Sequence, residues 1–478
     1  MNKIKSLLVI ALAVFVSASA FASTQNVKVS GSLDAYAFYR SNFDLTKNND
    51  AGSVPQGSTV PGVSHSGSAV SRSNVDEYFM SITQVQISAD LTDNVSTVIN
   101  LINQRDWNGT TFGSSTSAIA NEFDILLDLA YVQMKQIFYS PLTLTIGRQD
   151  LVFGRGFIVG WNPQDPNSNI QANEFTQIQS FDAIRATLDF SPWTIDLVYS
   201  KINEGSTNAE DDRDLYIANI NYKFAEYNAV AEAYYVGEFD RLTLASGLSS
   251  GDTRGNDTNI VGGRVQFDPI SQITLGGEVA YQFGNYRGAS STIALSSIPE
   301  RDREALGVDL FGEYRWDNAW KPMLGVEYVY LSGEEDLSAT TSASYGSWNG
   351  NYRLPVYGWI RDYLEVYYAT GSSNDQAAGQ NQQHICVYGS IKPLDDLQLA
   401  VQFYHFWTTD TAHAGITTPG SSTLSSDIGN EIDTVLTYNY TEDVTFTTMV
   451  DWFIPGDYYT APFNSTATQV VQEVKVVF

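Results

Sequence analysis

The sequence predicts an all-β protein, a transmembrane antiparallel β-barrel of about eighteen strands. Three observations support this fold class. The chain begins with an export signal, long segments alternate apolar and polar residues, and the connections between those segments are short and long in turn. Such a pattern is typical of strands that face lipid on one side and water on the other. No later stretch approaches the ~18 consecutive apolar residues of a membrane helix, so strands must carry any membrane role.

Residues 1–22 have the pattern of a secretory signal peptide. Two lysines precede an apolar run from Leu7 to Val16, and small residues follow up to Ala22 in an A-x-A arrangement. That run is too short to span a bilayer, and its ending is typical of a cleavage site. We therefore expect a mature chain that starts at Ser23 and forms a single barrel domain over residues 23–478.

Composition narrows the function classes. The net charge is −28, with 26 Lys and Arg against 54 Asp and Glu, which argues against nucleic acid as a partner. A disordered acidic chain is excluded by 28 Tyr, 24 Phe and 9 Trp. The single Cys386 excludes a disulfide framework and a cysteine-based metal cluster.

The alternating segments are longer than the strands of a soluble sandwich, the main alternative. In "QITLGGEVAYQF" (272–283), Leu275, Val279 and Tyr281 oppose polar residues on the other face. Such runs mostly reach ten residues or more, as a tilted barrel wall requires, whereas sandwich strands average ~5–6. Aromatic residues gather at the ends of the apolar faces, which is typical of the girdles of membrane barrels. They are Tyr39, Phe190, Trp193, Tyr222, Phe224, Phe267, Tyr314, Tyr440, Trp452 and Phe478.

Eight short turns and nine long loops separate eighteen predicted strands. The largest loops cover 41–74, 150–179 and 332–382, and we expect them on the external side, with both termini in the periplasm. The segment 360–371 resembles a strand, but counting it would give an odd number. We therefore assign it to the loop 332–382. The last strand ends on Phe478, which resembles the C-terminal signal by which outer-membrane proteins are recognised for assembly.

Charged residues on the water-facing phase, together with Arg148 and with Arg155 of the loop 150–179, are the candidate pore-lining or substrate-path residues. The bases are Arg148, Arg155, Arg185, Arg264 and Arg315, and the acids are Asp34, Glu232, Glu278, Asp309, Glu313, Glu327, Glu431 and Asp433. Regular alternation would aim Arg148 at lipid, so we expect either a bulge at Gly147 or a strand that has reached the outer rim there. The segment 150–179 carries Phe157, Ile158, Val159 and Trp161, and we expect it to fold inward and constrict the channel.

Catalysis is not predicted. The chain has four histidines, none with metal-ligand spacing to another, and no Ser/His/Asp set can be assembled. The acids of the water-facing phase are spread over many strands, which fits a channel lining. We therefore expect no enzyme activity, no cofactor and no metal site.

Two stretches resemble a known family. They are "LTIGRQDLVFGRGFIVGWNP" (144–163) and "IGNEIDTVLTYNYTEDVTFTTMVDWFIPGDYY" (428–459), and they resemble the alginate export porins. The resemblance implies an eighteen-stranded outer-membrane barrel, a pore near Arg148, and export or diffusion of anionic polysaccharide or small solutes.

Three functions remain open from the sequence. The first is a water-filled porin for hydrophilic solutes, the second an exporter of anionic polysaccharide, and the third a non-conducting scaffold or sheath around a partner protein. In each case we expect contact with outer-membrane lipid and lipopolysaccharide, and a periplasmic or secretion partner stays open. Acids outnumber bases on the water-facing phase, which favours a weakly cation-preferring or unselective pore, with a local basic ladder through Arg148, Arg185 and Arg264.

The alternation of connections predicts the topology. A protease-cleavable tag near Ser344 should be cut on intact cells, whereas a tag at Asp395 should be protected. Cleavage at Asp395 with protection at Ser344 would reverse the register of all the strands.

Overall fold

A computed structural model describes most of the chain from residue 26 onward. The described residues are 26–43, 45, 59–60, 63–64, 75–107, 125–162, 170–204, 212–241, 256–286, 300–334, 344–369, 380–410, 425–459 and 464–478. The predicted signal peptide and most of the loop 41–74 lie outside them.

Eighteen long antiparallel strands form the wall within these described ranges. In chain order they are β1 (Asn26–Ser41), β4 (Val75–Thr92), β5 (Val95–Asp106), β6 (Leu126–Met134), β7 (Leu142–Gln149), β8 (Phe181–Asp189), β9 (Trp193–Asn203), β10 (Arg213–Lys223), β11 (Val230–Asp240), β12 (Asn256–Ile270), β13 (Ile273–Tyr286), β14 (Arg301–Arg315), β15 (Met323–Leu331), β17 (Gln382–Leu394), β18 (Leu397–Trp407), β19 (Asp427–Asn439), β20 (Val444–Pro455) and β21 (Ala467–Val477). The predicted fold class and strand number are confirmed.

Shorter elements lie between the wall strands. The two-residue strand β16 (Ser344–Tyr345) pairs in parallel with β14, and β2 (Thr59–Val60) pairs with β3 (Val63–Ser64) in a separate small sheet. Two 3₁₀ turns, η2 (Ile137–Tyr139) and η3 (Asn173–Phe175), and the helix α2 (Trp359–Ala369) complete the described elements. No described helix combines the length and the apolar character that a membrane span needs.

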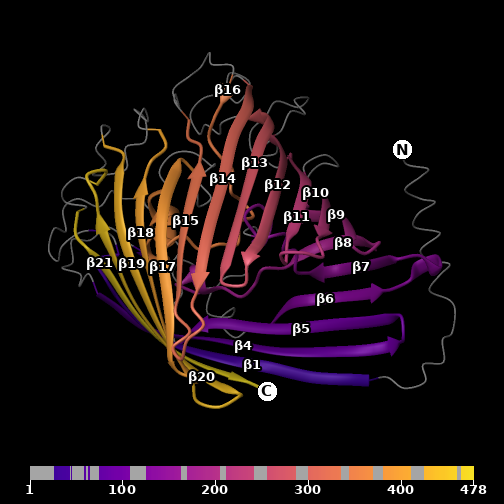
Figure 1. The fold of residues 1–478 in the computed structure, drawn as a ribbon, viewed down its shortest axis with the longest axis horizontal. Helices are drawn as coiled ribbons and strands as arrows, with labels where there is room; N and C mark the ends of the chain where they lie inside the picture. Colours follow the sequence, from indigo (N-terminus) through magenta and orange to yellow (C-terminus); the bar gives the residue numbers. More distant parts are fainter. Residues whose placement is uncertain are drawn as a thin grey trace.

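The wall closes between its first and last strands. Each strand pairs with its neighbours in sequence, and β1 pairs with both β4 and β21. Figure 1 shows the result: β4–β7 run across the view, while β12–β15 run steeply, as the sheet wraps round. The backbone of Phe478 completes the closure, because its N–H donates to the Gly31 carbonyl (3.0 Å) and its carbonyl accepts from the Gly31 N–H (2.9 Å).

The two faces of the wall differ as the alternation predicts. Along β13, Leu275, Val279 and Tyr281 are 39–49% exposed, whereas Glu278 and Gln282 on the opposite phase are at most 4% exposed. Successive side chains of a strand point to opposite faces. The exposed apolar set therefore faces lipid, and the buried set faces the lumen.

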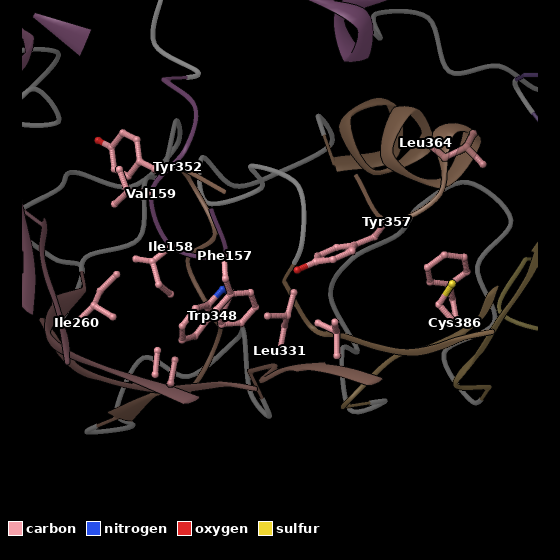
Figure 2. Close-up of a cluster of buried hydrophobic side chains, with 14 of the residues drawn as sticks. Phe157, Ile158, Val159, Ile260, Leu331, Trp348, Tyr352, Tyr357, Leu364 and Cys386 are labelled. Carbon is pink, nitrogen blue, oxygen red and sulfur yellow. The ribbon is translucent and has the colours of Figure 1, made fainter. Parts of the chain in front are cut away.

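Part of the lumen is filled by protein. Residues 151–162, 170–180 and 348–364, called here the luminal segments, pack against inward-facing wall residues. Phe157 and Trp348 stack at 5.8 Å between ring centroids, and both are at most 2% exposed. Figure 2 shows them in one cluster with Val159 of the same segment and with Ile260 of the wall. The inward fold expected for 150–179 is thus present in its described parts, 151–162 and 170–179, and residues 348–364 also lie inside the barrel.

The even strand number excluded the segment 360–371 from the wall, and its described residues, 360–369, form no strand of any kind. Residues 359–369 form the helix α2 instead. Its residues Ile360 and Leu364 are four positions apart and both fully buried, so they share one face of the helix. This i, i+4 spacing was the signal that favoured a helix over the strand-like reading.

Closure makes a testable demand on Gly31. A Cβ at this position would lie 2.6 Å from the Gln84 carbonyl oxygen and 2.6 Å from Cζ of Phe478. Gly31→Val should therefore destabilise the barrel by roughly 1–3 kcal/mol through overpacking. The measurement is the urea concentration at which half of the protein has lost the compact, fast-migrating gel band of the folded barrel. The gel samples are not heated before loading. Ser30→Val, on the adjacent position, is the control, and equal loss in both variants would contradict this account.

Candidate functional site

The lumen contains one continuous row of charged side chains, called here the charged belt. It crosses five neighbouring strands and one luminal segment. Its members are Glu232 (β11), Arg264 (β12), Glu278 (β13), Asp309 (β14), Glu327 (β15) and Arg155 of the segment 151–162. All six are among the residues that the sequence predicted to line the pore.

Strand register brings the wall members of the belt together. Glu232 is directly opposite Arg264, Arg264 is opposite Glu278, and Glu278 is opposite Asp309. Paired residues on adjacent strands project to the same face with their Cβ atoms ~4.5–5.5 Å apart. The Arg264 guanidinium donates to Oε1 of Glu232 at 2.7 Å. The wall therefore presents three carboxylates and one guanidinium side by side.

Arg155 closes the belt from the luminal side. Its Nη1 donates to Oδ2 of Asp309 at 3.0 Å, its Nη2 donates to Oε1 of Glu327 at 2.6 Å, and its guanidinium lies 4.1 Å from the ring centroid of Phe311. Burial alone would lower the pKa of Arg155, but the carboxylates of Glu327 and Asp309 outweigh this effect and raise it. Arg155 therefore carries a permanent positive charge between two wall carboxylates.

Two glycines allow the segment to reach this position. Gly154 (φ +57°) and Gly156 (φ +76°) flank Arg155 in the left-handed region, which glycine adopts without a steric penalty. A Cβ on Gly156 would lie 2.7 Å from Cβ of Leu354 in the other luminal segment. The "GRG" of the sequence thus forms the tight turn that aims Arg155 at the wall.

The belt carries more acid than base. Four carboxylates face two guanidinium groups, so the pairing leaves an excess of negative charge when all six are ionised. Taking ions out of water costs several kcal/mol each, and ion pairs offset this cost only with good geometry. A confined path lined in this way concentrates cations and excludes like charge.

The three arginines of the predicted basic ladder lie in three separate ion pairs. Arg148 lies 3.5 Å from Asp182, Arg185 lies 2.8 Å from Asp196, and Arg264 is bound in the belt. Arg148 is the last residue but one of β7, and neither neighbouring strand shifts its register at Gly147. Asp182 is paired with Arg148 on the neighbouring strand and points to the opposite face of the wall from the buried Phe181. The side chain of Asp182 is two-thirds exposed.

The remaining candidates occupy other parts of the lumen. Arg315 pairs with Glu313, which also accepts from the Tyr388 hydroxyl at 2.9 Å. Asp34 is fully buried and accepts from Nε2 of Gln177 in a luminal segment at 2.7 Å. The structure therefore does not bring these three candidates into the charged belt.

Glu431 has a role that the sequence did not suggest. Its two carboxylate oxygens accept from the backbone N–H groups of Ile360 (2.7 Å) and Arg361 (2.8 Å), in the first turn of α2. A carboxylate stabilises these otherwise unpaired donors and the positive end of the helix dipole. Asp433 shares the face of Glu431 and is directly opposite Asp451 of β20. The wall carboxylate thus holds the luminal helix in place.

Several contributors were missed at the sequence level. The Tyr234 hydroxyl donates to Oε1 of Glu278 at 2.7 Å, and the Tyr352 hydroxyl donates to Glu238 at 2.8 Å. Tyr234 is in phase with Glu232, so period-two alternation could have identified it. The partner choice of Tyr352 depends on a contact 114 residues away, for which the sequence gives no signal. Within the described residues, no group of three or more His, Cys, Asp or Glu is placed to hold a metal ion.

Comparison with known families now assigns the barrel. The model of the family described as "Alginate export" matches residues 64–473. The chain belongs to the alginate export family. This family membership and the closed barrel place it in the outer membrane of a Gram-negative bacterium, as a barrel channel.

Solved structures are similar to this alginate export family barrel at low sequence identity, and the first of the two named here shares its fold. The crystal structure of Pseudomonas aeruginosa OccK9 (OpdG) is 11% identical, with a TM-score of 0.54 over 95% of this chain and 99% of that one. The outer membrane protein OpdK from Pseudomonas aeruginosa is also 11% identical, with a TM-score of 0.49 over 95% and 98%. A comparison with curated proteins finds no significant match.

Arg155 and Arg315 should contribute unequally to the free energy of unfolding. Arg155→Met leaves Asp309 and Glu327, which are 3% and 12% exposed, without their cation. We expect a loss of about 2–3 kcal/mol in the free energy of unfolding, somewhat below the ~3–5 kcal/mol of a fully buried pair. Arg315→Met, at a side chain 52% exposed, should cost no more than about 1 kcal/mol. Urea unfolding in micelles measures both.

A compensating variant tests the cause of that loss. Combining Arg155→Met with Asp309→Asn and Glu327→Gln removes the unpaired charges and should recover most of the stability. If the triple variant is no more stable than Arg155→Met, the loss comes from packing against Phe311 and not from the ion pairs.

Proposed function

We propose that this outer-membrane barrel is a channel for small hydrophilic solutes, with an unselective or weakly cation-preferring path past the charged belt. One observation carries the proposal: each belt arginine is bound by carboxylates, and carboxylates remain in excess. An ion in the path therefore meets a net negative wall. Small neutral solutes and cations pass such a wall more readily than anions.

The same observation disfavours export of a polyanion by this member of the family. A path for a chain of carboxylates needs exposed cations that are free to exchange partners. Arg155 and Arg264 have side chains 31% and 10% exposed, and each donates to wall carboxylates at 3.0 Å or less. A passing polyanion would have to displace these partners and leave them unpaired.

A second candidate function has its own support. The luminal segments bury Phe157, Trp348, Tyr352 and Tyr357 against the inner wall, so part of the cross-section is solid. This packing fits a barrel that supports or surrounds a partner protein without solute flux. Conductance of the purified barrel in a planar bilayer separates the two, because a scaffold conducts no current.

We further propose that both termini lie in the periplasm. An even number of wall strands brings the two chain ends to one rim, and Phe478 bonds to Gly31 near the start of β1. The eight short connections between wall strands lie on that same rim. In outer-membrane barrels the short turns face the periplasm.

Ion selectivity is the decisive measurement. In a tenfold KCl gradient the reversal potential should be near zero or of the sign for cation preference. The preference should weaken as salt rises, since the Debye length falls from ~10 Å at 0.1 M to ~3 Å at 1 M. Arg185→Ser and Arg264→Ser should increase the cation preference. Strong anion selectivity that these substitutions abolish would restore the polyanion exporter.

A further inference from the structure

His384 lies between the wall and a luminal segment. It is on β17, in phase with the inward-facing Cys386, and it is fully buried. The ring of Tyr357, from the luminal segment 348–364, lies 4.6 Å from the imidazole between ring centroids. On the wall side, the rings of Phe406 and Tyr404 lie at 5.2 and 5.8 Å. The segment 348–364 therefore covers the imidazole and keeps it from water.

This burial is unfavourable for the imidazole. Neither ring nitrogen of His384 has a hydrogen-bond partner among the described residues. A neutral imidazole carries an N–H donor on one nitrogen and a lone pair on the other. Burying both without partners costs free energy, and contact with water would recover it. Movement of the segment 348–364 away from the wall would relieve this cost.

The charges around His384 oppose a proton on its ring. Arg353 and Arg361 of the segment 348–364 place positive charge near the imidazole, although Arg353 also pairs with Asp362 at 3.0 Å. Two carboxylates on neighbouring strands are already engaged. Glu327 of β15 accepts from Arg155, and Glu431 of β19 accepts from the first turn of α2. A protonated His384 would thus be a further buried cation beside two arginines, which is strongly unfavourable.

The other titratable groups against His384 do not offset such a charge. They are Tyr357 of the luminal segment, Tyr404 of β18 and Cys386 of β17 itself. Phenol and thiol side chains are neutral at and below neutral pH. The imidazole is therefore neutral as long as the segment 348–364 is packed on it.

We propose that acid releases the segment 348–364 from the wall through protonation of His384. In the released state the imidazole meets water and titrates near the ordinary value for histidine, ~6.5. Release then takes up a proton at lower pH, so acid favours the released state. One proton makes the equilibrium constant for release about 30-fold larger at ~pH 5 than at ~pH 7.5.

Release would widen the lumen. Trp348, Tyr352 and Tyr357 of the segment fill part of the cross-section, and they would leave it together. The inference goes beyond the proposed function, because it concerns the width of the path and not the solute that passes.

Cys386 reports release without any added label. It is the single cysteine of the chain, it is two positions from His384 on the same face of β17, and it is 1% exposed. Figure 2 shows it in one apolar cluster with Tyr357 and Leu364 of the luminal segment. N-ethylmaleimide should therefore reach Cys386 when the segment leaves the wall.

The test is the rate of this labelling in the full mature chain in detergent micelles, divided by the rate for free cysteine at the same pH. From ~pH 7.5 to ~pH 5 the normalised rate should rise by about 30-fold in the unsubstituted chain. In His384→Phe, which keeps an aromatic ring of similar size but cannot titrate, it should change by less than about threefold. His384→Gln is polar and also cannot titrate, so it keeps the test decisive if the phenylalanine variant fails to fold.

His405→Phe is the matched control. His405 is on the neighbouring strand β18, opposite the exposed Ile385, and its Nδ1 lies 3.0 Å from Oδ1 of Asn430. It faces away from the luminal segments, so this variant should keep the acid response of the unsubstituted chain. His65 and His413 lie outside the described residues and are the same in every variant.

Three outcomes would overturn the proposal. The first is an unsubstituted chain whose normalised labelling does not rise in acid. The second is an equal rise in His384→Phe and His384→Gln, which would assign the response to carboxylates such as Glu431. The third is loss of the response in His405→Phe as well. A barrel that shows the expected labelling pattern but carries no current supports the acid release and refutes the proposed channel alone.

Discussion

The structure depends on the absence of water in the hydrocarbon core of the membrane. Every backbone N–H and C=O in that layer must find a partner within the protein, and only a helix or a closed sheet supplies one for each. Here the ladder closes between β1 and β21, from the Ser32–Val477 pair to the Ser41–Thr468 pair, and Phe478 extends it by two hydrogen bonds to Gly31. Once the ring is closed, each strand has one face in lipid and one in the lumen, and the placement of all charged residues follows from that division.

The wall and the luminal segments satisfy each other's polar groups. Glu431 accepts from the first turn of α2, Asp34 accepts from Gln177, and Arg155 lies between Asp309 and Glu327. A luminal helix end or an inward carboxylate would each be costly alone, because a polar group that is buried without a hydrogen-bond partner loses its hydration and gains nothing in return. The packing of Phe157 and Trp348 adds apolar contacts to these polar ones. The constriction is therefore part of the barrel's own stability and not a detachable addition.

The charge balance is the basis for proposing small solutes rather than the cargo named in the description of the family. Arginines are present at the ladder positions, but Arg148, Arg185 and Arg264 each face a wall carboxylate. A fold hosts many cargoes, and the local chemistry of the path selects among them. In this lumen the carboxylates of the charged belt outnumber its guanidinium groups, and the proposal of an unselective or weakly cation-preferring path rests on that excess.

The sequence by itself determined the barrel, its strand number and the inward phase of the charged wall residues. Alternation with period two is local, so Glu232, Arg264, Glu278 and Asp309 could be assigned to the lumen without knowing their neighbours. It also indicated an inward segment from Phe157–Val159, since such residues are wasted on solvent. It did not reveal that 359–369 is a helix capped by Glu431, or that Glu334 is buried against Arg301. Those outcomes were decided by the tertiary structure, because they depend on which carboxylate meets which partner. The two partners are far apart in the sequence, so no local pattern identifies them.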